Sequence, residues 1–428
     1  MQSLIASKKN IVVDEDIHIR NYKYTLNTIL MAIMYLHSSA SISYRGCSSI
    51  LCVNMSNNII SIKDFPKPET IIMWESKLGL FKLQYIEYKY DDMVWIADNV
   101  TMQNYKQCIT IIGIRLSTLD NMKDLILTKK DMVPLLVCPL ETSNKQTLLE
   151  LLNQTAKKHN TPRIIISDGG KDIKSACLEF CKMNQNCIWA YDYPHYIACR
   201  IKEIVNKCPI WNQFTYHITR IRKEHYNDKR HIKPPCYRVK GRFMGFCNYM
   251  NWYENKYLPN YECFPEFNKF VQENISYFNF WVCLSMITKE TCQICRKYGY
   301  SQLGIEHLKL LGSKVNDITQ SNVFESTMMN EIYKFFGTLY EHINSTFICV
   351  SRNNLMYSLA SSEIIESIFG MYKYARRGLR PLKTTGRTIL LIASRVGINT
   401  KNMILSALQI IKVQDIQDWI RIPLFSLN

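Results

Sequence analysis

The sequence predicts an α/β protein built on a mixed five-stranded sheet, with a helical region before the sheet and mainly helical regions after it. Short apolar runs rich in β-branched residues carry the strand signal. The clearest is the run of three isoleucines at 164–166, which is too apolar for a surface helix and is typical of a buried strand. From about residue 207 strand signals become few, and the readable periodicity is helical.

The order of the expected elements narrows the fold class to a ribonuclease-H-like α/β domain. Three strands come first, followed by a helix, a strand, a second helix and a last strand. In that fold the first and fourth strands lie side by side, so Asp98 and Asp168, which end these strands, are expected to be neighbours. Two glycines after Asp168 allow a sharp turn at the carboxyl end of the strand. The strands are expected at 93–97, 107–116, 133–140, 163–167 and 187–191, and the first helix at 145–158. The second helix has Ile173, Ala176, Cys177 and Phe180 on one face.

The composition indicates a globular protein with a polyanionic partner. Of the 428 residues 47% are hydrophobic and 12% aromatic, which is enough for a core of ordinary size. The formal net charge of +17 favours nucleic acid as the partner, although a basic soluble protein without one would show the same excess. No apolar run approaches the roughly 18 residues that a membrane helix needs, so no membrane partner is expected.

The 16 cysteines are irregularly spaced over a long chain, which favours reduced thiols in a cytosol-like compartment over a disulfide framework. Cys292 and Cys295 form a CxxC pair. No second pair is spaced correctly to complete a structural zinc site, so zinc is not expected there.

Basic side chains gather in two clusters. Between residues 220 and 242 nine basic residues face two acidic ones, with aromatic residues interleaved. This pattern suits a phosphate backbone with unstacked bases nearby, and a solvated basic loop would have the same composition. A second cluster follows residue 373. The candidate DNA-binding residues are Arg220, Arg222, Lys223, Lys229, Arg230, Lys240, Arg242, Arg376 and Arg377.

Four regions are expected along the chain. A helical DNA-binding region at 1–85 precedes the first part of the catalytic domain at 90–206. A mainly helical insertion at 207–350 and a region at 351–428, with a carboxylate-bearing helix and C-terminal helices, complete the chain. In the first region a helix at 69–78, ended by a glycine, could be the second helix of a helix-turn-helix, and a small helical domain fits equally well. The side chains expected to face DNA are Thr70, Met73, Glu75 and Lys77.

A third acidic residue completes a set with Asp98 and Asp168. On the helix predicted for SSEIIESIFGMYK, residues 361–373, we prefer Glu366, and Glu363 is the alternative one turn earlier. Three carboxylates suit two Mg²⁺ (or Mn²⁺) ions, because these hard cations prefer oxygen ligands and clamp the oxygens of a phosphoryl transfer. Asp98 would bridge the ions, with Asp168 on one and Glu366 on the other. Taken alone, Asp168 could be a helix cap or a turn residue.

These segments resemble bacterial DDE transposases of the insertion-sequence type. The resemblance rests on VWIADN, IIISDGG, YDYPH and SSEIIESIFGMYK, and it spans most of residues 24–410. It maps the metal-binding triad onto Asp98, Asp168 and Glu366, and an Asp-x-x-His motif onto Asp192 and His195. The helical insertion between the second Asp and the Glu also fits. Lys373, seven residues after Glu366, matches a lysine that would touch DNA.

The resemblance implies a DNA transposase that cleaves and joins strands at element ends with two Mg²⁺ or Mn²⁺ ions. It further implies double-stranded DNA as partner, a homodimer on DNA, and a cytoplasmic, nucleoid-associated location. Asp192 and His195 would stabilise the junction with the insertion or approach the scissile phosphate. Two alternatives stay open: a repurposed DNA-binding protein without catalysis, and a ribonuclease-H-like nuclease. A basic structural protein would show no metal-dependent activity at all.

Overall fold

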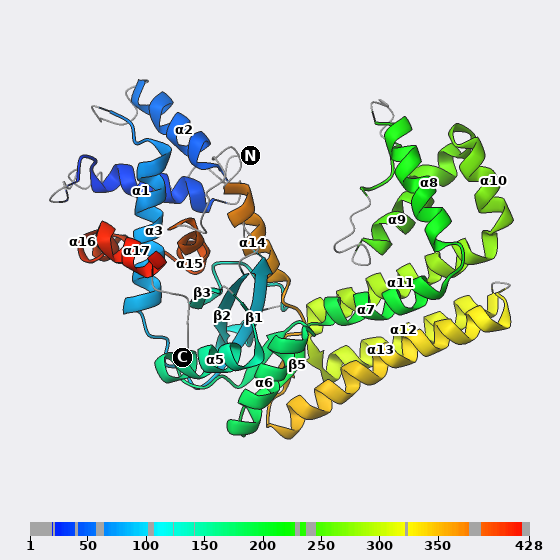
Figure 1. Cartoon of the computed structure of the whole chain (residues 1–428). Coiled ribbons are helices and arrows are strands. Elements are labelled where there is room, and N and C mark those ends of the chain that lie inside the picture. Colours follow the sequence, from blue (N-terminus) through cyan, green and yellow to red (C-terminus); the bar gives the residue numbers. More distant parts are fainter. Residues whose placement is uncertain are drawn as a thin grey trace, which may run out of the picture. The chain divides into compact units, whose positions relative to one another are not determined.

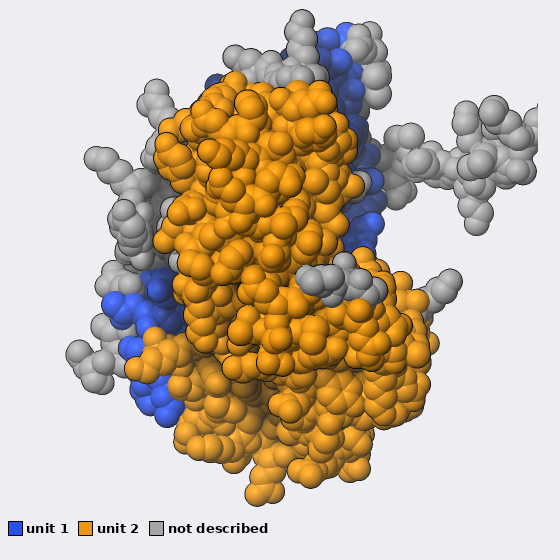
Figure 2. Space-filling model, turned by 90° about the vertical axis from the view of Figure 1, so that its right-hand side faces the viewer, with its two compact units in different colours: residues 1–115, 127–161, 363–428 blue, residues 116–126, 162–362 orange. Residues whose placement is uncertain are grey.

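The computed structural model places the chain in two compact units (Figure 2). Unit 1 takes residues 1–115, 127–161 and 363–428, and unit 2 takes residues 116–126 and 162–362. No helix among the residues that the structure describes is long and apolar enough to cross a membrane. The described residues are 19, 22–38, 42–56, 64–101, 107–122, 124–140, 142–226, 232–236, 245–321, 324–375 and 387–421.

Unit 1 contains an antiparallel meander of β1 (Met93–Thr101), β2 (Gln107–Arg115) and β3 (Val133–Leu140). Residues 93–97 of β1 are all buried, as a strand covered on both faces requires. The helix α5 (Lys145–His159) packs on β3 and begins at Asn144, whose side chain accepts a hydrogen bond from the Thr147 amide at 2.9 Å.

The helices of unit 1 are arranged around α3 (Figure 1). Helix α3 contacts α1, α2 and all three short C-terminal helices, which explains why most of its residues are buried. The helical elements in contact with α3 are α1 (Leu26–His37), α2 (Tyr44–Ser56), η4 (Arg387–Leu390), α15 (Leu391–Arg395), α16 (Lys401–Ile410) and α17 (Val413–Arg421). Helix α14 (Glu363–Ala375) packs on α15 and β1.

Two expectations for α3 (Pro68–Tyr85) are wrong. The helix does not end at Gly79 but continues to Tyr85, because Gly79 is where the backbone of η4 passes against the helix: a Cβ there would overlap the carbonyl of Leu390. Glu75 and Lys77, expected to face DNA, are 0% and 8% exposed. The helix is a central packing element, and these two side chains point into unit 1.

Unit 2 begins its α/β part with a parallel pair of strands, β4 (Ile164–Ser167) and β5 (Ile188–Tyr191). The crossover between them is α6 (Lys171–Met183), and α7 (Tyr193–Lys207) follows β5. The five strands form a mixed sheet in the order β3-β2-β1-β4-β5. The expectation that the first and fourth strands are neighbours is confirmed.

The rest of unit 2 is mainly helical, as predicted, and α11, α12 and α13 are long helices in contact with one another (Figure 1). A second core of aromatic rings, including Trp211, Phe214, Phe267, Phe278 and Trp281, holds the shorter helices together. The elements of unit 2 outside the sheet are α4 (Leu116–Leu119), α8 (Trp211–Glu224), α9 (Phe246–Trp252), η2 (Tyr253–Tyr257), η3 (Leu258–Cys263), α10 (Pro265–Glu273), α11 (Ile275–Tyr298), β6 (Tyr300–Ser301), α12 (Gln302–Ser321), α13 (Ser326–Arg352) and β7 (Tyr357–Ser358).

Candidate functional site

Asp98 lies in β1, paired with Thr110 of β2, at the point where the buried part of the strand ends. The side chain is partly exposed, and its Oδ1 accepts a hydrogen bond from the Asn99 amide at 2.6 Å. The Asn99 side chain in turn donates to Ser143 Oγ at 3.1 Å. The sequence placed Asp98 at the end of its strand, but β1 continues to Thr101, so Asp98 lies inside the strand. The two bonds leave the Asp98 side chain partly exposed.

Asp168 follows β4 directly and is also partly exposed. Its Oδ1 accepts a hydrogen bond from the Gly170 amide at 3.1 Å, at the start of α6. The Asp168 carboxylate therefore stabilises the turn before α6, which agrees with the alternative that Asp168 is a turn residue. The turn contact still leaves it at the carboxyl end of a strand, where open α/β sheets present their binding residues.

Glu363 and Glu366 stand in the first turn of α14. Ile365, Ile368 and Phe369 of this helix are buried, whereas Glu366 is exposed and Glu363 partly exposed. Helix α14 packs on β1, so the elements that carry Asp98 and Glu366 lie together within unit 1. Asp168 belongs to unit 2.

Among the described residues, no three His, Cys, Asp or Glu side chains gather closely enough to hold a metal ion. The chemistry of the donor set still fits magnesium, because all three predicted ligands are carboxylates that are at least partly exposed.

Asp192 and His195 form a close pair in unit 2. Asp192 follows β5, its side chain is 2% exposed, and its Oδ2 lies 2.6 Å from Nδ1 of His195, whose side chain is 34% exposed. Their spacing of three residues at the start of α7 brings the two side chains together. The Asp-x-x-His motif is thus a contact pair, with the acid inside and the imidazole near the surface.

Three of the predicted DNA-binding residues lie on α8. Arg220 pairs with Glu266 and, at 3.4 Å, with Glu224, and Arg222 donates to the carbonyl of Pro234 at 2.6 Å. Lys223 is exposed and is the member best placed for a phosphate. The side chain of Lys373 lies outside the described residues, as do Lys229, Arg230, Lys240, Arg242, Arg376 and Arg377.

Sequence reasoning missed a buried ionic centre on Glu75 in unit 1. Its carboxylate accepts hydrogen bonds from Arg395 Nε at 2.7 Å and from Ser394 Oγ at 3.1 Å, and it also contacts Tyr44 and His37. Burial alone would raise the pKa of Glu75, but Arg395 and His37 outweigh burial and hold the pKa well below its usual range. The sequence around Glu75 gave no sign that this residue is buried, because a glutamate at that spacing is typical of the exposed side of a helix.

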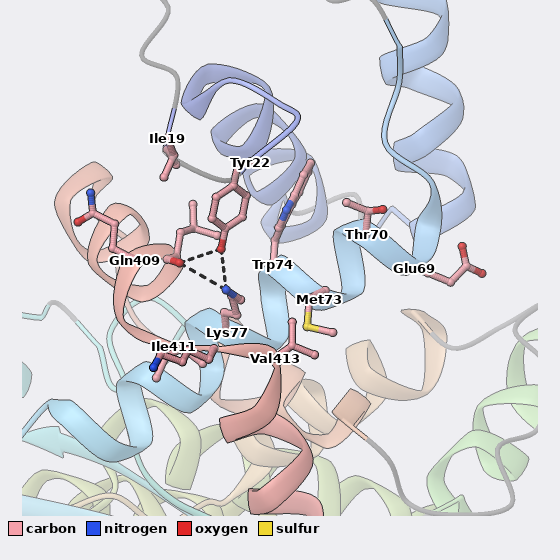
Figure 3. Close-up of a pocket in the computed structure, with 12 residues that line it drawn as sticks. Ile19, Tyr22, Glu69, Thr70, Met73, Trp74, Lys77, Gln409, Ile411 and Val413 are labelled. Atoms are coloured by element: carbon pink, nitrogen blue, oxygen red, sulfur yellow. Dashed lines mark hydrogen bonds between the residues drawn. The ribbon is translucent and has the colours of Figure 1, made fainter.

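A cavity of about 820 Å³ opens beside α3, the helix that carries Glu75 (Figure 3). At its floor the Lys77 amine donates to the Tyr22 hydroxyl at 2.7 Å, and that hydroxyl donates to the carbonyl of Leu408 at 2.8 Å. Burial lowers the pKa of Lys77 and raises that of Tyr22 to about 12. Lys77 thus joins α3 to the end of α16 rather than contacting DNA.

Comparisons with known proteins leave the family of this chain open. No protein-family model matches the sequence, and no curated protein matches it. Among solved structures, the Drosophila P element transposase strand transfer complex is similar, with 15% sequence identity and a TM-score of 0.41. The match covers 89% of this chain and 93% of that one. A likeness at this level does not assign a family, and the function has to be argued from this chain's own residues.

Proposed function

We propose that this protein is a DNA transposase of the DDE type, with Asp98, Asp168 and Glu366 as the ligands of two Mg²⁺ or Mn²⁺ ions. The observation that carries the proposal is the placement of the three carboxylates on the fold. Asp98 and Asp168 come from strands that are neighbours in the sheet order, and the helix that carries Glu366 packs on the strand that carries Asp98. Each carboxylate is partly or fully exposed.

The chain's own residues would then divide the work. Asp98, Asp168 and Glu366 would hold the two cations. Bound there, the cations would supply Lewis-acid chemistry for the attacking and leaving oxygens of a phosphoryl transfer. Lys223 and Lys373 would contact the DNA backbone. No protein side chain need become covalently attached to DNA, because a water or a DNA 3′-hydroxyl serves as the nucleophile.

A DNA-binding protein without cleavage is the second candidate. Two observations favour it: the Asp168 carboxylate is engaged by the turn at Gly170, and no metal-binding group of side chains stands ready among the described residues. A nuclease that cuts without joining would use the same three carboxylates, and it differs from a transposase only in its products.

The test is cleavage of labelled DNA carrying the genomic ends that flank the coding region, with magnesium, manganese or EDTA. We compare the wild type with Asp168→Asn, because an asparagine keeps the acceptor for the Gly170 amide and removes only the charge. The matched control is Asp172→Asn, an exposed acid in the first turn of α6. Metal-dependent nicking that Asp168→Asn loses and Asp172→Asn keeps supports the proposal. Binding without nicking in any metal favours the second candidate.

The third ligand is decided by a separate pair of variants. Glu366→Gln should abolish nicking, whereas Glu363→Gln should leave most of it, because the two stand at different places in the first turn of α14. The reverse result would move the metal ligand to Glu363. Joining of the cut ends to a second DNA molecule then separates a transposase from a nuclease.

A further inference from the structure

The backbone of Asp192 is tied to the strand that leads to Asp168. The Asp192 amide donates to the carbonyl of Ser167 at 2.9 Å. Ser167 is the last residue of β4, and Asp168 follows it immediately. Because Asp192 itself comes directly after β5, this bond extends the parallel pairing of β4 and β5 by one residue.

The side chain of Asp192 is tied to the segment that leads to Glu366. Its Oδ1 accepts a hydrogen bond from the Ser362 amide at 2.8 Å, while Oδ2 lies against Nδ1 of His195. The next amide, that of Tyr193, donates to the carbonyl of Ala360 at 2.8 Å. Both carboxylate oxygens are thus engaged in a place where the residue is 1% exposed, so Asp192 has no open side for a metal ion.

The same segment is held from its other end. β7 pairs with β6, with Tyr300 opposite Ser358, and the Tyr300 hydroxyl donates to the carbonyl of Tyr191 at 2.6 Å. Gly299 precedes β6 with a φ of 62°, and a Cβ at that position would overlap the carbonyl of Ser358. Residues 357–362 are therefore fixed along their whole length before α14 begins at Glu363.

We propose that Asp192 and His195 are positioning residues that hold Ser362, the residue from which the chain enters α14. Ser362 directly precedes α14, and Glu366 stands one turn into that helix, so a shift at Ser362 is carried to Glu366. On the other side, Ser167 directly precedes Asp168. The pair thereby acts through the backbone at Ser167 and at Ser362, and not through the carboxylate of Asp168 or of Glu366. This inference rests on the proposed role of these two carboxylates as metal ligands.

The test combines two measurements on the full chain. Hydrogen exchange of peptides covering 359–366 reports the clamp, and nicking against magnesium concentration reports the site. Asp192→Ala should speed exchange in this segment. It should also lower the nicking rate by about 10²-fold, as a misplacement of about 1 Å does, and raise the magnesium concentration needed. Asp192→Asn keeps an acceptor for the Ser362 amide and should restore most of both.

Two further variants bracket the effect. His195→Gln should give a smaller change in the same direction as Asp192→Ala, because it removes the partner of Oδ2 and leaves the bond to Ser362. Glu203→Ala on the same helix removes an exposed ion pair with Arg200 and should change neither measurement.

Three results would overturn the inference. They are normal exchange at 359–366 in Asp192→Ala, faster exchange spread evenly over all of unit 2, and an Asp192→Asn variant as impaired as Asp192→Ala. The last would mean that Asp192 acts through its charge. If the wild type nicks no DNA, the proposed function fails. In that case faster exchange confined to 359–366 still supports the clamp, and unchanged exchange overturns it.

Discussion

The two units each bury an acidic residue, and the two acids are held in different ways. Glu75 in unit 1 is surrounded by side chains: Arg395, His37, Tyr44 and Ser394 all contact its carboxylate. Among the described residues, the Asp192 carboxylate in unit 2 contacts the His195 side chain and the backbone amide of Ser362. Both residues are essentially inaccessible, with exposed fractions of 0% and 1%.

The difference teaches that burial of an acid does not by itself reveal its role. The partners of Glu75 come from α1, α2 and α15, all of which pack on α3, so this centre holds the helices of unit 1 together. The backbone partner of Asp192 lies in a connecting segment that leads into another helix. The predicted metal ligands Asp98, Asp168 and Glu366 are distinguished from both by their exposure.

The largest effect on stability is expected from Glu75→Ala. Removing the carboxylate leaves Arg395 buried without its counter-charge, which costs about 3–5 kcal/mol in the free energy of unfolding. Glu69→Ala, an exposed acid on the same helix, should stay within about 0.5 kcal/mol of the wild type. Urea denaturation measures both. Equal stabilities for the two variants would remove Glu75 from the framework of unit 1.

A smaller loss is expected from Gly299→Ala in unit 2. The positive φ and the overlap with the Ser358 carbonyl should together cost about 1–3 kcal/mol and loosen the segment before α14. Gly337→Ala is the control, because Gly337 lies in α13 with open space around it and should gain up to about 1 kcal/mol. Thermal unfolding distinguishes them, and a neutral Gly299→Ala would argue against a rigid connection.

The pH dependence of stability tests Lys82, a buried amine of α3 whose charge interacts with that of Glu75. Burial lowers the pKa of Lys82 from 10.5 to about 7. The unfolded chain therefore binds more protons at Lys82 between pH 7 and 10.5, so the contribution of Lys82 to stability should rise with pH by at most about 1.4 kcal/mol per pH unit. Below pH 7 this contribution no longer changes. Lys82→Met should flatten the rise, and a slope unchanged by that substitution would contradict a buried amine.

The smallest effect is expected on the surface of α8. Lys223→Ala should lower the slope of log binding constant against log salt by about 0.9 for one lost phosphate contact. Arg220→Ala should lower the slope less, since Glu266 and Glu224 already balance the charge of Arg220. Filter binding at several salt concentrations measures both. An unchanged slope in Lys223→Ala would remove α8 from the DNA interface.

Local patterns determined much of what could be said in advance. The strands around Asp98 and Asp168 and the helical insertion follow from the spacing of apolar residues, which reports period 2 or 3.6 over short windows. The expectation that the first and fourth strands are neighbours came from the fold class. Asp168 after its strand and the helix of Glu366 were identified by the same local reading, whereas the Asp-x-x-His pair was identified by the resemblance to transposases. Asp98 was expected to end its strand, but β1 continues past it to Thr101. Their joint use as a metal site stays a prediction.

Only the tertiary structure decided which polar residues are buried and what they bind. Glu75 meets Arg395 across 320 residues, and Asp192 meets the Ser362 amide across 170. A sequence window cannot predict such pairs, because each depends on which surfaces of distant elements come together. Helix α3 shows the physical reason. Its charged side chains can be buried because they bind partners from the C-terminal part of the chain, and those elements cover most of the helix surface.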